Sequence, residues 1–174
     1  VYGEVRESEL PVSEERTLSP ETPYSISKSN AEEILRRYSD IYGFDHAIVR
    51  PFTVYGPRQR PDELFTKFLS MMEKGDPLTV YGDGTQSRDF THVEDVVRGC
   101  LLAARHGEGT YNIATGRRVT VNKVTEILQQ EFRRVEIRHL PEKKGDVSHT
   151  HADISKARNE LSYSPEKVIE ESID

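Results

Sequence analysis

The sequence contains one cysteine, no tryptophan and no long hydrophobic run. A single cysteine, Cys100, excludes an internal disulfide framework, and its position in an apolar, helix-like run predicts a buried structural thiol. No apolar stretch reaches the ~18 residues that suggest a membrane span, and no signal peptide opens the chain. We therefore expect a cytoplasmic protein without membrane association.

Basic runs are also absent. The 174 residues include 24 Lys+Arg and 30 Asp+Glu, giving a formal net charge of −6. This balance argues against nucleic acid as a partner but does not exclude a small anionic ligand, because a local site matters more than net charge. Hydrophobic residues make up 34% and charged residues 31%. Since this is polar for a compact domain, we expect much exposed surface or a missing partner.

Metal ligands are sparse. His149 and His151, with His139 nearby, are the best candidates. No cysteine or carboxylate completes a ligand set at suitable spacing. The sequence therefore predicts no metal site.

Hydrophobic periodicity predicts helices that alternate with short strands, a pattern typical of an α/β fold. The loops are expected at 4–23 and 53–61. Strands are predicted at 47–49, 78–81, 111–114 and 135–139, and helices at 25–42, 62–74, 93–104, 121–132, 154–161 and from Ser164-Pro165 onward. Asp62, Thr120 and Ser164 are the expected N-caps, and Gly43 and Gly75 the expected helix ends.

Tyr24 and Lys28 lie four residues apart at the start of a predicted helix, so their side chains share one face. A free phenol ionises near pH ~10, and roughly 4 kcal/mol is needed to make it a base at pH 7. One positive charge ~4 Å away supplies about 4 kcal/mol at an effective dielectric of ~20. The spacing therefore suggests a tyrosine base, although such a pair also arises by chance and its surroundings must support it.

The surroundings contain a series of motifs in a fixed order. They are Val1-Tyr2-Gly3, Pro23-Tyr24-Ser25-Ile26-Ser27-Lys28, Arg50-Pro51-Phe52-Thr53-Val54-Tyr55-Gly56-Pro57, Arg60-Pro61-Asp62, Val80-Tyr81-Gly82-Asp83-Gly84, Arg88-Asp89-Phe90-Thr91-His92-Val93, Gly145-Asp146 and Ala152-Asp153-Ile154-Ser155-Lys156-Ala157. Over nearly the whole chain this order resembles the NAD-dependent epimerase/dehydratase family, the extended short-chain dehydrogenases, and most of all its UDP-glucose 4-epimerases.

The resemblance implies a catalytic role for Tyr24 and Lys28. Tyr24 would take the proton from the sugar 4-hydroxyl while hydride passes to NAD, and would later return a proton. Lys28 would lower the pKa of the base and touch the nicotinamide ribose. Pro51 would line the cofactor site, and Phe52 the sugar pocket, although an ordinary core role for Phe52 is equally consistent with the sequence.

The resemblance also implies a UDP site. Val80 and Tyr81 match the segment that holds uracil, although a plain strand is an equal alternative. Arg88 matches a diphosphate-binding arginine, whose planar fork suits two phosphates; a surface ion pair with Asp89 is the alternative. Thr53 stands where some relatives place an asparagine against the phosphate. Asp146 matches an acid that reaches the ribose, and Lys143 stands near a diphosphate arginine of many relatives.

Thr150 occupies the position of a tyrosine that closes the hexose pocket in some relatives. Smaller residues there accompany acceptance of N-acetylated sugars in the family. The resemblance therefore predicts tolerance of UDP-N-acetylglucosamine beside UDP-glucose, unless the loop differs and Thr150 faces solvent.

None of the 11 glycines forms the glycine-rich turn that binds the NAD pyrophosphate in such enzymes. We therefore expect the C-terminal half of a longer enzyme, inactive alone. Residues 1–57 and 88–116 would belong to the Rossmann domain, and residues 58–87 and 117–174 to the nucleotide-sugar domain. The family pairs subunits through two helices each, one of which carries Tyr24, so a homodimer is expected of the complete protein.

Two other interpretations stay open. A sister activity is the first: a 4,6-dehydratase, a decarboxylase or a UDP-glucuronate 4-epimerase, in which Arg60-Pro61-Asp62 also occurs. The second is a non-catalytic fragment that binds a nucleotide sugar or dimerises.

Overall fold

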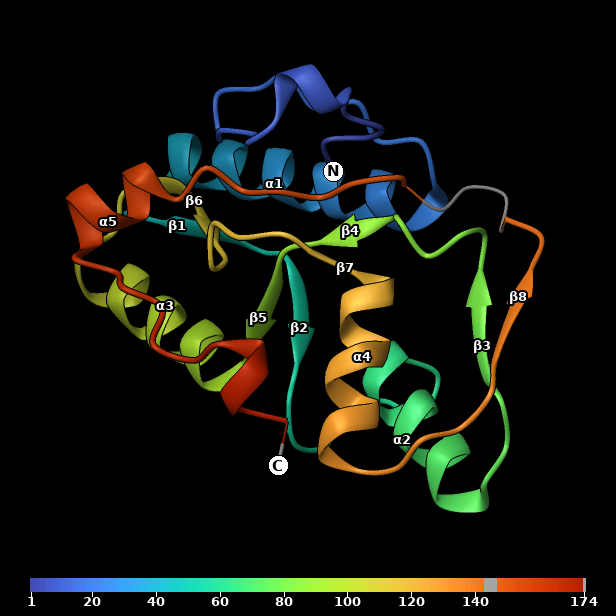
Figure 1. The fold of residues 1–174 in the computed structure, drawn as a ribbon. Helices are drawn as coiled ribbons and strands as arrows, with labels where there is room; N and C mark the ends of the chain where they lie inside the picture. The colour runs from blue at the N-terminus through green and yellow to red at the C-terminus, as the bar shows by residue number, and fades with distance from the viewer. Residues whose placement is uncertain (143–146, 174) are drawn as a thin grey trace.

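The computed structural model describes residues 1–142 and 147–173 (Figure 1). Strands and helices alternate along the chain, which confirms the α/β prediction. The helices are η1 (Glu7–Glu9), α1 (Pro23–Tyr42), α2 (Leu64–Lys74), α3 (Val93–His106), α4 (Val121–Glu131), α5 (Ser155–Leu161) and η2 (Ile169–Glu171). The strands are β1 (Ala47–Pro51), β2 (Thr53–Tyr55), β3 (Leu78–Tyr81), β4 (Ser87–Arg88), β5 (Phe90–His92), β6 (Gly109–Ile113), β7 (Val119–Thr120) and β8 (Ile137–Leu140).

Strands β1 and β6 form a parallel pair that runs from Ala47 opposite Gly109 to Pro51 opposite Ile113. In Figure 1, α1 lies above this pair and α3 below it. A Cβ atom at Gly99 would lie 2.6 Å from the Ile113 side chain, so only glycine lets α3 approach β6 this closely. This close contact holds the ends of β1 and β6 where the candidate site lies.

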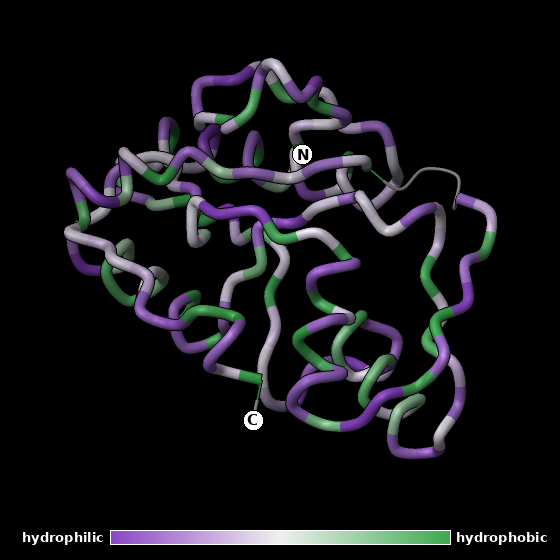
Figure 2. Tube along the Cα trace, viewed as in Figure 1, coloured by the Kyte–Doolittle hydropathy of each residue, from purple (hydrophilic) through white to green (hydrophobic). Residues whose placement is uncertain are grey.

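The second region is built from the parallel pair β3 and β8 with α2 and α4. Its core consists of hydrophobic residues from all these elements except β8: Phe65, Phe68, Met72, Leu78, Val80, Val124, Ile127 and Leu128, with Tyr55 and Phe90 from β2 and β5. Hydrophobic and hydrophilic stretches alternate along α2 and α4, as expected for helices that bury one face (Figure 2).

Segments far apart in the sequence join the two regions. Strand β2 pairs in parallel with β5, and β4 pairs antiparallel with β7. Residues 148–150 run beside β4, where Ser87 donates its N–H to Ser148 O at 3.1 Å and accepts from Thr150 N at 3.0 Å. These long-range pairs make β2 and β4 strands, so the predicted loop at 53–61 is wrong in its first three residues.

Two helix starts differ from the predictions. Ser164-Pro165 begins no helix, because the N–H groups of Glu166 and Lys167 donate to the buried carboxylate of Asp95 at 3.0–3.2 Å. Asp62 does not cap α2, which begins at Leu64. Asp62 and Glu63 instead form ion pairs with Arg60. In both places an interaction with a charged side chain, Asp95 or Arg60, takes the group that would have started the helix.

Cys100 is exposed on α3 and not buried as predicted. The helix turns Asp95, Gly99 and Ala103 toward the sheet, and Cys100 lies off that face. Thr120 caps α4, and Gly43 and Gly75 end α1 and α2 in the left-handed conformation, as predicted. No helix of the described residues has the length and apolarity needed to cross a membrane.

Candidate active site

The start of α1 fixes the positions of Tyr24 and Lys28. Thr22 Oγ1 accepts from Ser25 N at 3.1 Å, and Ser25 Oγ accepts from Thr22 N at 2.9 Å, a reciprocal N-cap. Pro23 occupies the first helical turn, where its missing N–H costs nothing. Lys28 Nζ lies 5.5 Å from the centroid of the Tyr24 ring, whose side chain is largely exposed. The predicted base and its cation therefore lie close together.

A cavity of about 510 Å³ opens between α1 and β1. Tyr24 and Lys28 line it from the helix, and Pro51 lines it from the end of the strand. The three residues predicted to bind the cofactor are thus brought to one cavity. Its other lining residues include Glu32 and Arg50, which form a buried ion pair.

A second cavity, of about 390 Å³, adjoins the first at Pro51, which lines both. Phe52, Thr53 and Thr150, all predicted to bind substrate, line this second cavity. The alternative of a solvent-facing Thr150 does not hold, because Thr150 is half-buried and its Oγ1 accepts from Asp89 N at 3.2 Å.

A third cavity, of about 260 Å³, lies at the end of β3. Tyr81 lines it with the turn that follows, whereas the Val80 side chain is 1% exposed and packs in the apolar core. The alternation of side chains along a strand explains the split. Val80 could therefore meet a ligand through its backbone only, and a uracil contact of this segment stays a prediction.

Arg88 lies at the end of β4, and its guanidinium is oriented by backbone oxygens. Arg88 Nη1 donates to Ser87 O at 2.9 Å and to Ser148 O at 3.2 Å. The alternative of an ion pair with Asp89 is not found, and the Asp89 carboxylate instead accepts from Thr115, Gly116 and Ala152. The remaining predicted substrate residues, Lys143 and Asp146, lie outside the described residues.

Sequence reasoning considered His149 only as a metal ligand, but the structure places it at the candidate site. His149 and Val147 each line both the Tyr81 cavity and the Phe52 cavity. Their spacing of two in an extended segment was the signal that both face the same way. Among residues 1–142 and 147–173, no cluster of three or more His, Cys, Asp and Glu could hold a metal.

A buried polar network connects the base helix to the sheet. Arg50 donates to both carboxylate oxygens of Glu32, at 2.8 and 2.6 Å, and to Tyr2 Oη at 2.8 Å. Tyr2 in turn donates to Asn112 at 2.7 Å. Burial alone would raise the pKa of Glu32, but hydrogen bonds and charge from Arg50 and Arg36 hold it below its usual value. Burial raises the pKa of Tyr2, so it stays a neutral donor.

Asp89 fixes the loops beside Arg88. Its fully buried carboxylate accepts from Thr115 N and Oγ1, from Gly116 N and from Ala152 N, at 2.6–3.2 Å. Burial raises its pKa, and the hydrogen bonds from Thr115 and Ala152 oppose that rise. The carboxylate thereby ties the end of β6 to the segment that carries Thr150.

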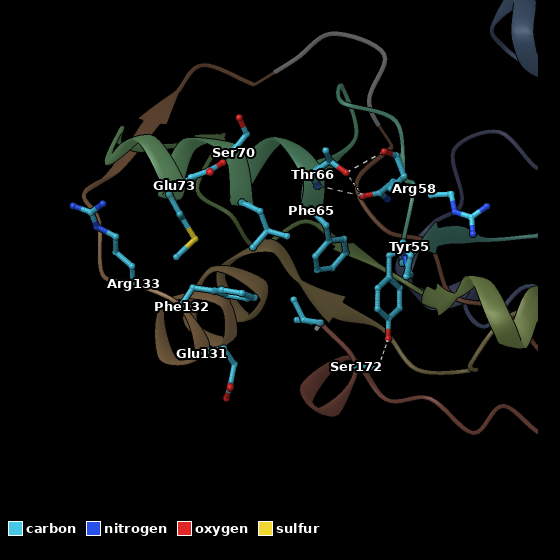
Figure 3. A pocket seen from close by; sticks show the side chains of 16 residues that line it. Tyr55, Arg58, Phe65, Thr66, Ser70, Glu73, Glu131, Phe132, Arg133 and Ser172 are labelled. Carbon is cyan, nitrogen blue, oxygen red and sulfur yellow. Dashed lines mark hydrogen bonds between the residues drawn. The ribbon is translucent and has the colours of Figure 1, made fainter.

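The largest cavity lies elsewhere. It measures about 860 Å³ and is lined by apolar side chains of α2, by Tyr55 and by Phe132 after α4 (Figure 3). Tyr55 Oη and Ser172 Oγ, 2.7 Å apart, close one side. None of the predicted site residues that the structure describes lines this cavity, so its size does not make it the candidate active site.

Comparisons with known proteins identify the family and the fold. The model of the "NAD dependent epimerase/dehydratase family" matches residues 1–114. The chain is 40% identical to the uncharacterized UDP-glucose epimerase YtcB of Bacillus subtilis, over 99% of this chain and 55% of that protein. The chain spans about half the length of the curated relatives it matches.

Solved structures, of which this chain covers little more than half, contain the same fold. A UDP-N-acetylglucosamine 4-epimerase from Methanobrevibacter ruminantium M1, in complex with UDP-N-acetylmuramic acid, has a TM-score of 0.93 at 33% identity over 99% of this chain and 57% of that one. A UDP-glucuronic acid 4-epimerase from Bacillus cereus, in complex with UDP-glucuronic acid and NAD, has a TM-score of 0.92 at 34% identity over 99% and 56%.

Proposed function

We propose a function on one premise: the chain belongs to the NAD dependent epimerase/dehydratase family. The complete protein epimerises C4 of a UDP-hexose through transient oxidation to the 4-keto sugar. The observation that carries this proposal is the placement of Tyr24, Lys28 and Pro51 on one cavity that adjoins the cavity of Phe52, Thr53 and Thr150. The proposed base therefore lies next to both the proposed cofactor site and the proposed sugar site.

The lining of the first cavity fits NAD. Lys28 supplies a cation and hydrogen-bond donor for the ribose, and Pro51 a flat apolar wall. When bound, NAD would accept a hydride from the sugar carbon and return it to the opposite face. Tyr24 takes the proton of the 4-hydroxyl at its Oη and gives it back when the ketone is reduced. Lys28 favours the ionised phenol by its charge.

The division into two functional regions is part of the proposal. Residues 1–57 and 88–116 contain β1 and β6 and would complete a Rossmann sheet. Residues 58–87 and 117–174 contain the α2, β3, α4 and β8 unit with its own apolar core. UDP would lie across both, with uracil at Tyr81 and the diphosphate at Arg88, helped by Thr53.

Thr150 sets the sugar range in this proposal. It lines the sugar cavity and carries a short side chain where a larger one would narrow that cavity. UDP-N-acetylglucosamine should therefore be turned over beside UDP-glucose. Turnover of UDP-glucose together with complete rejection of the acetylated sugar would contradict this role of Thr150.

UDP-glucuronate is the alternative substrate, since several relatives and structural neighbours are named for it. The Arg60-Pro61-Asp62 motif gives no support through contact, because Arg60 is exposed, pairs with Glu63 at 2.6 Å and lines none of the three site cavities. Product analysis of the complete protein with UDP-glucose and with UDP-glucuronate distinguishes the two substrates. Interconversion of UDP-glucose and UDP-galactose supports the proposal, and exclusive use of UDP-glucuronate rejects it.

The complete protein is proposed to form a homodimer through α1. Ile34, Tyr38 and Ile41 are 58%, 54% and 71% exposed on this helix, an unusual apolar surface. Ile41→Glu should convert the dimer to a monomer in sedimentation. Val97→Glu, at a half-exposed position on α3, is the matched control and should leave the dimer intact. A dimer unaffected by Ile41→Glu would exclude this surface.

A further inference from the structure

We propose that His149 binds the diphosphate of the nucleotide sugar, with its Nε2–H donating to a phosphoryl oxygen. The inference rests on the proposed function and adds to the UDP site a donor from the segment after residue 146. The Tyr81 cavity would take the base and the Phe52 cavity the sugar. In a UDP-sugar the diphosphate connects these two parts. His149 lines both cavities and therefore lies at the connection.

A contact with Ser87 fixes the orientation of the His149 ring. His149 Nδ1 lies 2.8 Å from Ser87 Oγ, and Ser87 is only 3% exposed. Backbone pairing of Ser87 with residues 148 and 150 holds the two side chains in register. The proposal takes the tautomer in which the Ser87 hydroxyl donates to Nδ1, so that the ring carries its hydrogen on Nε2, its remaining polar atom. No partner of Nε2 is found among the residues that the structure describes.

The neighbouring charges make a donor useful here. Asp83 and Glu142 line the Tyr81 cavity, and Glu4 accepts from Ser148 N at 3.3 Å. Arg88 Nη1 binds Ser148 O at 3.2 Å, so the arginine and the histidine are positioned by the same short segment. An anion at this place is repelled by carboxylates, and the Nε2–H of His149 adds to the attraction from Arg88.

Two variants of His149 test the roles of its two ring nitrogens separately. The carboxamide of His149→Asn can replace Nδ1 toward Ser87 but has no atom at Nε2, whereas the longer side chain of His149→Gln can place an N–H near Nε2. UDP, UMP and uridine are titrated into the 174-residue chain by calorimetry. His149→Asn should weaken UDP binding roughly 10-fold, as for a lost hydrogen bond to a charged group. His149→Gln should stay within about 3-fold, and uridine affinity should not change.

His139→Asn is the matched control. His139 Nδ1 also binds a neighbouring oxygen, Gly82 O at 2.8 Å, but His139 lines neither cavity. Its UDP affinity should equal that of the wild type. A measurement on the unaltered chain guards against misfolding of a variant: UDP should shift the ¹⁵N resonance of His149 Nε2, and uridine should not.

The outcomes distinguish this inference from its premise. If the unaltered chain binds no UDP, the proposed nucleotide site and the role of His149 both fall. If the unaltered chain binds UDP, two results would reject the role of His149 alone. One is equal UDP affinity of His149→Asn, and the other is an Nε2 resonance that UDP does not shift. Equal losses of UDP and uridine in His149→Asn would indicate a structural role and also reject the proposal.

Discussion

Buried polar groups stabilise the face of β1 and β6 that α1 covers, whereas β3, which carries Tyr81, packs on an apolar core. Strand β1 directs Arg50 into the network with Glu32 and Tyr2. Strand β3 directs Leu78 and Val80 against α2 and α4. Apolar contacts are non-directional, but a buried ion pair is satisfied only in one geometry. Tyr24, the proposed base, requires a fixed position of α1 relative to β1. Tyr81, which would contact a flat ring, requires only that β3 be well packed.

The largest expected effect separates the two regions by function. Tyr24→Phe in the complete protein removes the proposed base and should lower kcat about 10²- to 10⁴-fold. UDP binding should stay unchanged, because the Tyr81 cavity shares no residue with α1. Steady-state kinetics and calorimetry measure both quantities. Unchanged turnover would reject Tyr24 as the base, and a parallel loss of UDP binding would show that the regions are not independent.

The next effect tests the polar network. Arg50→Met removes the two hydrogen bonds that Arg50 donates to the buried Glu32 carboxylate and leaves it only Arg36, at 2.9 Å. The free energy of unfolding should fall by about 3 kcal/mol, the low end for breaking a buried pair. Adding Glu32→Leu should recover most of it, because no buried charge then remains. Glu33→Gln breaks the exposed pair with Arg37 and should cost only about 0.3–0.5 kcal/mol. Urea denaturation gives all values, and an Arg50→Met loss as small as the control would show that the network contributes little.

A truncation in the other region gives the apolar counterpart. Leu128 is fully buried in the core of α2, β3 and α4, so Leu128→Ala should cost about 2–5 kcal/mol. This loss should be nearly the same at low and high salt, since no charge changes. Denaturation at both salt concentrations provides the measurement. A strongly salt-dependent loss would mean that the two regions are not stabilised by different interactions.

The smallest effect is the pH dependence that Glu32 contributes to stability. The pKa of Glu32 is lower in the folded chain than its usual value, so the ionised carboxylate stabilises the fold above pH ~4.3. This stability is lost as the pH falls through the folded pKa. Glu32→Gln should therefore show a shallower loss of stability below pH ~4 than the wild type. Thermal melts from pH 7 to pH 3 test it, and parallel curves would contradict it.

Local patterns predicted the elements whose signals lie within a few residues. The α1 stop at Gly43, the Thr120 cap and the whole of β3 follow from side-chain type and periodicity alone. Strands β4 and β7 have two residues each and exist through pairing with each other, so no local window could reveal them. The failed helix at Ser164 has the same origin, since Asp95 is 71 residues away from the amide it captures.

The grouping of the candidate residues was predictable where the family motif is continuous and less so where distant segments meet. Tyr24, Lys28 and Pro51 share a cavity as the resemblance implied. Val80 and Tyr81 were both predicted to lie at the uracil site. Successive side chains of a strand point to opposite faces, so Val80 is buried in the core while Tyr81 is exposed. His149 could be judged only after the chain had brought residues 147–149 between two cavities.

Asp89 has a consequence for grafting loops onto this scaffold. One carboxylate binds the amides of Thr115, Gly116 and Ala152, which come from two loops of unrelated sequence. Lengthening either loop would withdraw donors from a buried charge and would loosen the other loop as well. The two loops can therefore be exchanged between homologous scaffolds only as a pair, together with the aspartate that joins them.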